Sequence, residues 1–568
     1  MKSLTLLVTT LTACLLCVNP AGGLSVIYIS SSLFTALLIS GLLSLIPSKK
    51  VGYMIMLVVG ELVLACCLVD CFCQEVFASP ITPHIMSNIM LSNLREMHEF
   101  IFTFIGVGLL SHWRIACLLA LMALMPVFLL FQYRYEEQFP WHRYVNYAYA
   151  LLFSVCFAFC AVPTYRYMQL FFQQHDYQRM EGLMLRGHHE EMATPLHRLL
   201  FAYYSTKVSS RILAQLKSST IQAKIDSCSY KSPHIVLVIG ESYNKHHSSL
   251  YGYTLPTTPL QQKRCDKGEL FVFNDVVSPW NITSNAILGL FSLWEYGMQD
   301  QLEEKPLVPI LFRQAGYEVS FFSNQYLIGG FLSGHTNKTG HFFLSDPELS
   351  HALFTHRNSK ANVYDMELLE QVKAYKTEHA SSAPTLDFIH LIGQHFDYSK
   401  RYPKQMAVFS HLHYSDRRLG KDAVETVMHY DNATRYNDNV LDKVIAMYSD
   451  EEALVIFVSD HGEEVFDEPS VGGRHFKTPT ALEARNEYEV PMWIWCSAAY
   501  MEKHADVVKS IKQSVNKPFL TDGMPQLLLS LAGISCEWLD DDRNILSEKY
   551  KCKPRIIAGS VDYDMLPF

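Results

Sequence analysis

Charged residues are missing from the beginning of this chain. Between Lys2 and Lys49 there is no Asp, Glu, Lys or Arg. Such a stretch is too long for one membrane span of roughly 20 residues and suits two, with a turn predicted at the Asn-Pro-Ala-Gly-Gly of 19–23. With the later apolar runs it predicts five transmembrane spans, at about 3–18, 25–47, 52–72, 115–132 and 147–164.

The chain also lacks an excess of positive charge, internal repeats and low-complexity tracts. It has 47 Lys and Arg against 56 Asp and Glu, for a net charge of -9, so its overall charge does not favour nucleic acid as a partner. No Cys-x-x-Cys pattern occurs after residue 165, which argues against a cysteine-ligated structural zinc in that part.

Positive charges predict how the spans are oriented. Lys49 and Lys50 follow the second span, and Arg134, His142 and Arg143 lie between the fourth and fifth. The positive-inside rule puts both loops in the cytoplasm. The loop at about 73–113 and everything after about 170 are then expected on the outer side.

Two features of the spans have alternative interpretations. The first span resembles a signal peptide, and the Leu-Thr-Ala-Cys of 11–14 resembles a lipoprotein cleavage site. The residues after Cys14 stay apolar, which favours an uncleaved span. Glu61, inside the third span, is either a functional residue or the partner in an interhelical hydrogen bond.

Most of the cysteines belong to the apolar part. Nine of the 14 lie at or before Cys160, mostly within predicted spans, where cysteine behaves as a small hydrophobic residue. An oxidising outer compartment permits disulfides among the other five, and we expect Cys536 to pair with Cys552. Because five is odd, at least one thiol should stay free.

The rest of the chain divides into a linker and a second domain. Residues 166–230 are charged and aromatic and predict linker helices at the membrane surface, with a solvated connector as the alternative. From 231 to 568, strand-like runs alternate with helix-like segments such as 364–377 and 434–449. The runs lie at 235–239, 318–323, 386–392, 454–459 and 490–495. This alternation predicts an α/β domain with helices on both faces of its sheet.

Three of these predicted strands end in polar residues, at 240–242, 393–397 and 460–464. In open α/β sheets, ligands bind outside the carboxyl ends of the strands. Glu241, Asp460 and His461 are residue types that bind zinc, although a lone Asp-His would equally suit a turn or a helix cap. Gly240 is expected to let the backbone turn sharply after its strand.

Five segments carry a resemblance to a known family. They are GESYNKHHSSLYGYTLPTTP (240–259), ITSN (282–285), GQHFDYSKRYP (393–403), YDNATRYNDNVL (430–441) and VSDHGEE (458–464). Their order resembles that of bacterial phosphoethanolamine transferases of the lipid A or lipopolysaccharide-modifying type, in the alkaline phosphatase/sulfatase superfamily. The resemblance covers essentially the whole chain. It implies a five-helix transmembrane bundle at 1–165 and a sulfatase-like catalytic sandwich around a mostly parallel sheet at 231–568.

The resemblance also implies a metal site. Glu241, Asp460 and His461 match zinc ligands, and Thr283 matches a nucleophile that also coordinates the metal, with Ser284 as its competitor. One zinc is expected to bind tightly. His395 and His475 match additional histidines that face the phosphoryl group or a second zinc.

Further residues match substrate contacts of the family. The segment 88–100 resembles a lipid-side segment, with Asn88, Ser92 and Glu96 on one helical face. Asn324 and Gln325, just past the 318–323 strand, are candidate headgroup contacts. His390 is expected on the other side of its strand. We expect His246 and His247 to lie at the surface.

The activity implied is transfer of phosphoethanolamine from phosphatidylethanolamine, through a phospho-threonine, to lipid A or another lipopolysaccharide or glycan acceptor. It implies a monomer in the bacterial inner membrane with a periplasmic catalytic domain. The alternatives are a glycerol-phosphate transferase, a sulfatase-type hydrolase and an inactive membrane-tethered lipid-binding module. No Cys/Ser-x-Pro/Ala-x-Arg maturation motif surrounds Thr283, and retention of all four metal-site residues argues against the inactive module.

Overall fold

The computed structural model describes residues 4–18, 26–77, 81, 86, 112–135, 147–158, 194–295, 298, 301–327, 343–379, 382–415, 419–467, 472–474 and 479–568. The chain divides into two compact units, one formed mainly by residues 1–211 and the other by the chain from 212 onward. The division falls inside α9, the helix of Pro195–Gln222, within the range expected to link the two parts.

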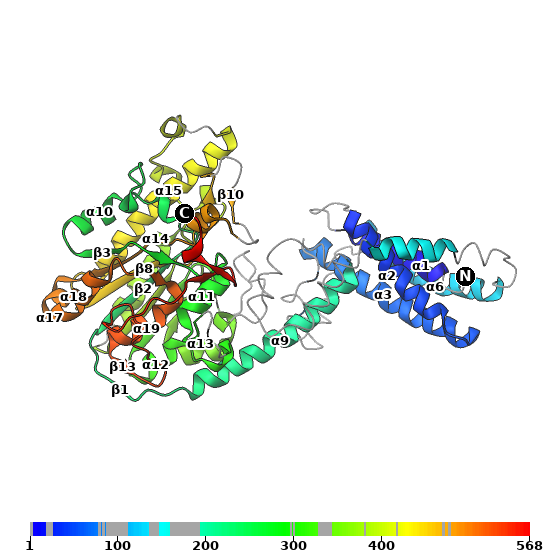
Figure 1. The fold of residues 1–568 in the computed structure, drawn as a ribbon, viewed down its shortest axis with the longest axis horizontal. Helices are drawn as coiled ribbons and strands as arrows, with labels where there is room; N and C mark the ends of the chain where they lie inside the picture. The colour runs from blue at the N-terminus through cyan, green and yellow to red at the C-terminus, as the bar shows by residue number, and fades with distance from the viewer. Residues whose placement is uncertain are drawn as a thin grey trace. The chain divides into compact units, whose positions relative to one another are not determined.

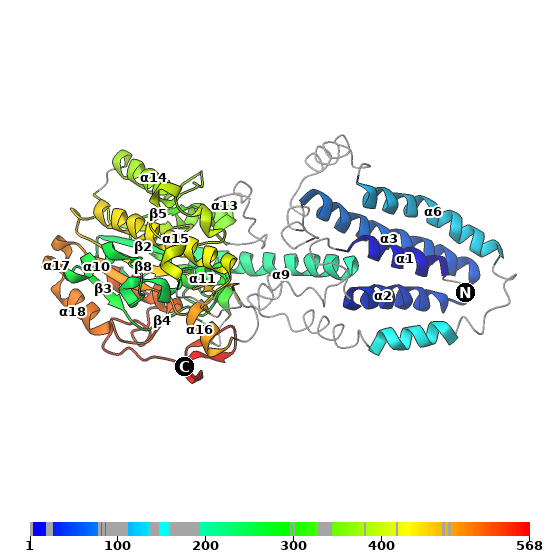
Figure 2. The same cartoon turned by 90° about the horizontal axis from the view of Figure 1, so that it is seen from above.

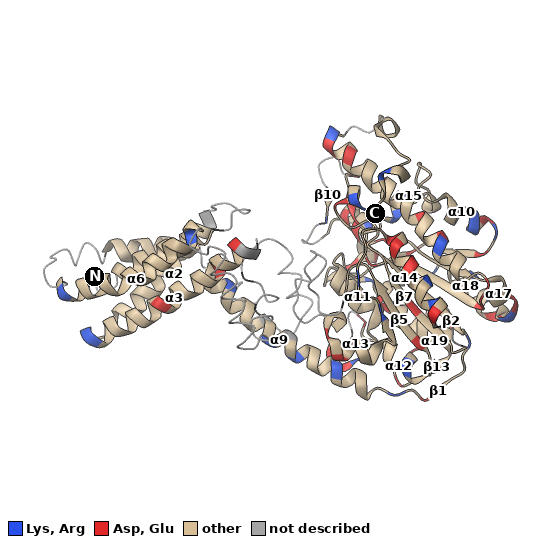
Figure 3. Cartoon of the chain, turned by 180° about the vertical axis from the view of Figure 1, so that it is seen from behind, with Lys and Arg blue, Asp and Glu red and all other residues tan. Residues whose placement is uncertain are grey.

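The first unit contains the apolar helices of the chain. They are α1 (Leu4–Leu16), α2 (Val26–Ser44), α3 (Lys49–Phe77), α6 (Trp113–Tyr135) and a helix over Tyr147–Ala158. Figure 3 shows few charged residues on them. Among the described residues, Lys49–Glu75 and Trp113–Tyr135 are long and apolar enough to cross a membrane, and the other three helices are shorter. The count of five spans therefore stays a prediction.

Glu61 lies in α3, among the apolar helices. Its Oε1 is buried and accepts no hydrogen bond, so that oxygen does not form the interhelical hydrogen bond considered for this residue.

The second unit is built on a seven-stranded sheet with the order β3-β11-β8-β2-β7-β5-β6. Its strands are β3 (Leu270–Phe273), β11 (Met492–Cys496), β8 (Ala453–Ser459), β2 (His234–Gly240), β7 (Thr385–His390), β5 (Glu318–Ser323) and β6 (His356–Arg357). The strands from β8 to β6 run parallel, and β11 is antiparallel to both of its neighbours. The sheet is thus mixed and mostly parallel, and all five predicted strands are present.

Some boundaries differ from the predicted ones, most clearly in β7 and in the predicted 434–449 helix. β7 ends at His390 rather than at 392, because the backbone N–H groups of Ile392 and Gly393 donate to the Asp365 carboxylate instead of to a neighbouring strand. The predicted 434–449 helix begins earlier, since α15 runs over Lys421–Met447.

Helices cover both faces of the sheet (Figures 1 and 2). α14 (Asp365–Glu378) and α15 pack against Val236 and Val238 of β2 on one face. On the other face lies α11 (Thr283–Phe291), whose Phe291 ring stacks on Phe388 of β7 with centroids 4.6 Å apart. The sheet is therefore buried on both sides, as its apolar strands require.

The remaining elements surround this core. The helices are α10 (Pro259–Asp266), α12 (Val308–Gln314), α13 (Pro347–Leu353), α16 (Ala481–Glu487), α17 (Ala498–Lys503), α18 (Ala505–Ser514) and α19 (Met524–Ala532). Two-residue strands pair as β1 (Ser227–Cys228) with β13 (Ile534–Ser535), β4 (Val276–Val277) with β12 (Phe519–Leu520), β9 (Glu464–Val465) with β10 (Gly472–Gly473), and β14 (Ile556–Ile557) with β15 (Val561–Asp562).

The expected disulfide is not present. Cys536 and Cys552 are both free thiols. Cys536 is buried, whereas Cys552 is exposed and its Sγ contacts the carbonyl oxygen of Lys553 at 3.4 Å. The two residues thus lie in different environments, and the pairing predicted from the sequence is wrong.

Gly240 has a different role from the one expected. It belongs to β2, and the positive φ after the strand falls on Ser242, at 54°. A Cβ at residue 240 would lie 2.9 Å from Cζ of Phe457, which is buried on the neighbouring β8. The glycine is therefore needed for space between two strands rather than for a turn.

We expect Gly240→Ala to lower the free energy of unfolding by about 1–3 kcal/mol, because the added methyl group overpacks the core against Phe457. Chemical denaturation of the full chain in detergent micelles measures this loss. Combining Gly240→Ala with Phe457→Leu should cost less than the sum of the two single changes, since the smaller side chain makes room. Strictly additive losses would contradict the steric explanation.

Candidate metal centre

The register between β2 and β8 brings together polar residues that are far apart in the sequence. Ile239 lies opposite Val458, and Gly240 lies opposite Ser459. The backbone N–H of Asp460 then donates to the carbonyl oxygen of Gly240 at 3.1 Å. Glu241 and Asp460 therefore leave the sheet side by side at the carboxyl ends of the two strands.

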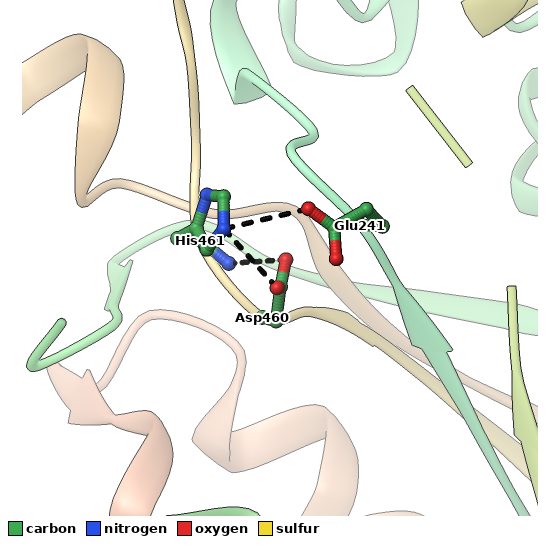
Figure 4. A group of neighbouring side chains, drawn as sticks. All are labelled: Glu241, Asp460 and His461. Carbon is green, nitrogen blue, oxygen red and sulfur yellow. Dashed lines mark hydrogen bonds and ion pairs between the residues drawn. The ribbon is translucent and has the colours of Figure 1, made fainter. Parts of the chain in front are cut away.

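Glu241, Asp460 and His461 form a compact buried group (Figure 4). His461 Nε2 lies 3.5 Å from Glu241 Oε1 and 3.2 Å from Asp460 Oδ2. One ligand atom from each residue can be chosen so that all three lie within 4.8 Å of one another, and no other group of His, Cys, Asp or Glu in the described part of the chain meets this criterion.

The imidazole of His461 is arranged as a lone-pair donor. Its Nδ1 donates to the carbonyl oxygen of Gly462 at 2.7 Å, which leaves the lone pair on Nε2, the atom that points at the two carboxylates. Burial, reinforced by the nearby Arg474, lowers the pKa of His461 to about 3. The imidazole is therefore neutral at physiological pH, as metal coordination requires.

The two carboxylates differ in protonation. Burial and the charge of Glu241 raise the pKa of Asp460 well above its usual range. Burial opposes ionisation of Glu241 as well, but the charge of Arg474 and the hydrogen bond from the Ser242 hydroxyl favour the ionised form, and the pKa of that carboxyl is lowered. Two adjacent buried carboxylates can both be ionised only when a cation balances their charges.

One oxygen of Asp460 points to what that cation would be. Oδ1 accepts hydrogen bonds from the backbone N–H groups of Ser242 and His461, at 3.0 and 2.7 Å, whereas the buried Oδ2 accepts none. A buried carboxylate oxygen without a donor is costly unless a cation lies beside it. Two carboxylates and one imidazole form a donor set that fits zinc.

Thr283 lies directly at this group. Its Oγ1 is 3.1 Å from His461 Nε2 and 3.3 Å from Glu241 Oε1. Thr283 is also the first residue of α11, whose N-cap, Ile282, provides no side-chain cap. The hydroxyl therefore lies at the positive end of the helix dipole, which would favour negative charge there.

The loop before Thr283 is held in place by hydrogen bonds. The Ser278 hydroxyl donates to the carbonyl oxygen of Asp460 at 2.6 Å, and the Asn281 side chain donates to Glu487 Oε2 at 2.6 Å. The nucleophile candidate is thereby tied to the segment that carries the candidate metal ligands.

Gln325 and Asn324 have different surroundings, although they are adjacent. The Gln325 amide donates to Glu241 Oε2 at 2.9 Å and to the carbonyl oxygen of Leu391 at 3.0 Å. The buried Asn324 amide donates to Asp365 Oδ1 at 2.8 Å. Gln325 thus orients the carboxylate of Glu241, and Asn324 orients the carboxylate that fixes the end of β7.

The histidines at the end of β7 lie near the metal group. His395 Nδ1 donates to the carbonyl oxygen of Phe396 at 2.7 Å, and its imidazole interacts electrostatically with Glu241. His390, which we expected to point elsewhere, is buried with its Nε2 3.2 Å from the Gln325 amide nitrogen. His390 therefore supports Glu241 through Gln325. Four predicted site residues lie outside the described part of the chain: His475, Asn88, Ser92 and Glu96.

Sequence reasoning missed Arg474 and Glu463. Arg474 Nη1 lies 2.8 Å from His461 Nε2, and its Nε lies 3.3 Å from Glu463 Oε2. The other oxygen of Glu463 accepts a hydrogen bond from Tyr398 at 3.1 Å. Their positions within VSDHGEE and beside His475 were visible in the sequence, but only the fold reveals that the two side chains meet.

Comparison with known proteins identifies the family. Residues 233–534 match the sulfatase family. This is more than half of the chain, and the chain therefore belongs to that family. Phosphoethanolamine transferase EptC of Escherichia coli strain K12 is 28% identical over 346 residues, which cover 59% of this chain and 58% of that protein. The match thus spans less than two thirds of the relative's length.

Two solved structures resemble the chain. The C-terminal periplasmic domain of EptC from Escherichia coli, in complex with Zn, is 26% identical with a TM-score of 0.51 and covers 61% of this chain and 96% of that domain. The integral membrane protein lipooligosaccharide phosphoethanolamine transferase A from Neisseria meningitidis is 17% identical with a TM-score of 0.51, and 96% of each chain is covered. The alkaline phosphatase/sulfatase-like fold predicted for the C-terminal domain is thereby confirmed, with a mixed sheet.

The segment that follows Glu241 is anchored by a buried charged histidine. His247, which we expected at the surface, is fully buried; its Nδ1 lies 2.6 Å from Asp431 Oδ1 and its Nε2 lies 3.3 Å from Asp467 Oδ2. Burial opposes its protonation, but the charges of Asp431 and Asp467 outweigh burial and raise the pKa of His247 to about 10. The ion pairs tie this segment to α15 and to the chain that follows His461.

We expect His247→Gln to destabilise the full chain by about 3–5 kcal/mol, because it leaves the buried Asp431 carboxylate and the partly accessible Asp467 carboxylate without their cation. The neighbouring His246→Gln, at a partly exposed residue paired with Glu489, should cost less than about 1 kcal/mol. Chemical denaturation in detergent micelles at neutral pH compares the two, and equal losses would contradict the assigned role.

The pH dependence gives a second test. The folded pKa of His247 lies above the unfolded value of about 6.5, so its contribution is complete below pH 6.5 and is lost as the pH rises towards about 10. The free energy of unfolding of the wild type relative to His247→Gln should therefore fall across this window. A difference that is constant from pH 6 to 10 would exclude a charged His247.

Proposed function

We propose that this member of the sulfatase family transfers phosphoethanolamine from phosphatidylethanolamine to lipid A or another lipopolysaccharide or glycan acceptor. The observation that carries the proposal is the contact of the Thr283 hydroxyl with both Glu241 and His461, at 3.3 and 3.1 Å. EptC of Escherichia coli, a phosphoethanolamine transferase, supports the substrate class. The lipooligosaccharide named for the Neisseria meningitidis protein supports a lipopolysaccharide acceptor.

The reaction would proceed in two steps on Thr283. Its Oγ1 attacks the phosphorus of phosphatidylethanolamine, diacylglycerol leaves, and phosphoethanolamine stays bonded to the threonine. An acceptor oxygen then attacks the same phosphorus and restores the hydroxyl. The N-terminus of α11 would stabilise negative charge on the phosphoryl oxygens during both steps.

The residues of the centre have separate roles in this scheme. Glu241, Asp460, His461 and Thr283 would hold one zinc ion, and Gln325 keeps Glu241 oriented. When bound, zinc would lower the pKa of the threonine hydroxyl and balance the charge of the two carboxylates. The Zn complex of the related EptC domain supports this choice of metal. A second zinc would need His395 and His475.

Contacts to the lipid would come from other segments. We assign Asn88, Ser92 and Glu96 to the substrate, together with His395 and His475. Asn324 and Gln325 would contribute indirectly, by orienting the carboxylates of Asp365 and Glu241. The chain would be a monomeric, multi-pass inner-membrane protein with a periplasmic catalytic domain, which agrees with a periplasmic EptC domain and an integral-membrane relative.

Replacing the nucleophile tests the reaction. We expect Thr283→Ala to reduce release of diacylglycerol from phosphatidylethanolamine by at least about 10³-fold, since the hydroxyl that contacts both His461 and Glu241 is removed. Zinc should still bind, because three ligands remain. Ser284→Ala is the matched control and should keep the activity. Loss of activity in Ser284→Ala with retention in Thr283→Ala would reverse the assignment.

Removal of the metal tests its role. A chelator should abolish diacylglycerol release, and added zinc should restore it. Zinc at 100 times its dissociation constant should stabilise the folded chain by about 2.7 kcal/mol, measured by chemical denaturation, and Asp460→Asn should lose most of this gain. Diacylglycerol release that resists the chelator would contradict the role of the metal.

The acceptor is identified by mass spectrometry of lipid A and core from cells with and without the protein. An added mass of one phosphoethanolamine shows where the group is transferred.

A further inference from the structure

Arg474 places a cation at the edge of the candidate metal centre. The residue lies in the short segment 472–474 that follows β9. Its Nη1 is 2.8 Å from His461 Nε2 and 3.1 Å from the carbonyl oxygen of Asn281. About a quarter of its side chain remains accessible, at 23%, so the residue lies at the border between the buried ligands and the solvent.

Glu463 holds the other side of this guanidinium. Its Oε2 lies 3.3 Å from Arg474 Nε, and the Glu463 side chain is only 5% exposed. The Tyr398 hydroxyl donates to the remaining oxygen of that carboxylate at 3.1 Å. The Nε edge of Arg474 is thereby anchored, while its Nη1 end reaches the metal ligand.

The contact with His461 conflicts with metal binding. Nε2 of His461 has a single lone pair, because its Nδ1 proton is donated to the carbonyl oxygen of Gly462. Arg474 Nη1 and a zinc ion held by Glu241, Asp460 and His461 would therefore compete for the same electron pair. The positive charge of the guanidinium adds repulsion to this competition.

Thr283 lies next to the same nitrogen. Its Oγ1 and Arg474 Nη1 are 3.1 and 2.8 Å from His461 Nε2. A phosphoryl group bonded to Thr283 would carry its nonbridging oxygens within reach of a guanidinium that had released His461. Guanidinium groups bind such oxygens through two parallel N–H donors.

We propose that Arg474 is a two-position anion-binding side chain. In the first position, which this structure shows, its Nη1 contacts Nε2 of His461. With zinc bound it pivots about the Glu463 contact and donates to the nonbridging oxygens of the phosphoryl group on Thr283. The phosphoryl group rests on the function proposed above, whereas the competition with zinc depends only on the metal centre.

Zinc affinity of the full chain in detergent micelles tests the first position. We expect Arg474→Gln to bind zinc about tenfold more tightly than the wild type, since a competing charge is removed. Glu463→Gln should bind zinc more weakly, because Arg474 loses its neutralising partner. Arg474→Gln in the Glu463→Gln background should again tighten binding, which excludes the freed carboxylate as the cause. Arg485→Gln, at an exposed arginine that contacts His246, is the control and should match the wild type.

Affinity of the zinc-loaded chain for inorganic phosphate tests the second position. Arg474→Gln should weaken phosphate binding about tenfold, and Arg474→Lys, which keeps the charge but lacks the planar fork, should recover part of it. Arg485→Gln should again match the wild type.

Either of two results overturns the proposal. One is zinc binding that is unchanged or weaker in Arg474→Gln, and the other is phosphate binding that is unchanged in that variant. Neither measurement uses a lipid substrate. If the wild type fails to release diacylglycerol, the proposed function fails while both affinities still decide the role of Arg474.

Discussion

The burial of two carboxylates and one imidazole between adjacent strand ends is the constraint on which the rest of this centre depends. Glu241 and Asp460 are neighbours because β2 and β8 are parallel and Gly240 lies opposite Ser459. Two negative charges on adjacent side chains repel each other strongly in a buried site. The surrounding structure therefore has to supply donors for some of their oxygens and a cation for the rest.

The hydrogen-bond donors for these carboxylates come from several segments around the carboxyl ends of the strands. Backbone N–H groups of Ser242 and His461 satisfy one oxygen of Asp460, and the Gln325 amide and the Ser242 hydroxyl satisfy Glu241. Close packing fixes the same region, since a Cβ at Gly462 would lie 2.2 Å from the carbonyl oxygen of Asn486. One oxygen of Asp460 remains without a donor. A closely packed site with one oxygen left for a cation is suited to bind a metal once Arg474 releases His461.

The same geometry joins metal binding to nucleophilic attack. Thr283 begins α11 on the opposite face of the sheet from α15, and its loop is bonded to the carbonyl oxygen of Asp460 through Ser278. Displacement of the ligand strands would therefore also displace the nucleophile. His247, buried between Asp431 and Asp467, ties the chain that follows Glu241 to α15. These ion pairs therefore fix the segment that directly follows the candidate metal ligand Glu241.

The amino-acid order alone predicted five of the seven strands of the sheet, though not β3 or β6, and the polar residues that follow three of them. The periodicity of apolar residues is a local property, so the strands that lead to Glu241 and Asp460 could be predicted from the sequence. The residue types at those strand ends indicated metal ligands, and the family resemblance added Thr283. Tertiary structure decided what each side chain contacts. The burial of His247, the use of Gln325 to orient Glu241, the meeting of Arg474 with His461 and the separation of Cys536 from Cys552 all depend on pairs distant in sequence. No local pattern encodes such pairs, because they form only when the strand register and the helix packing bring the two segments together.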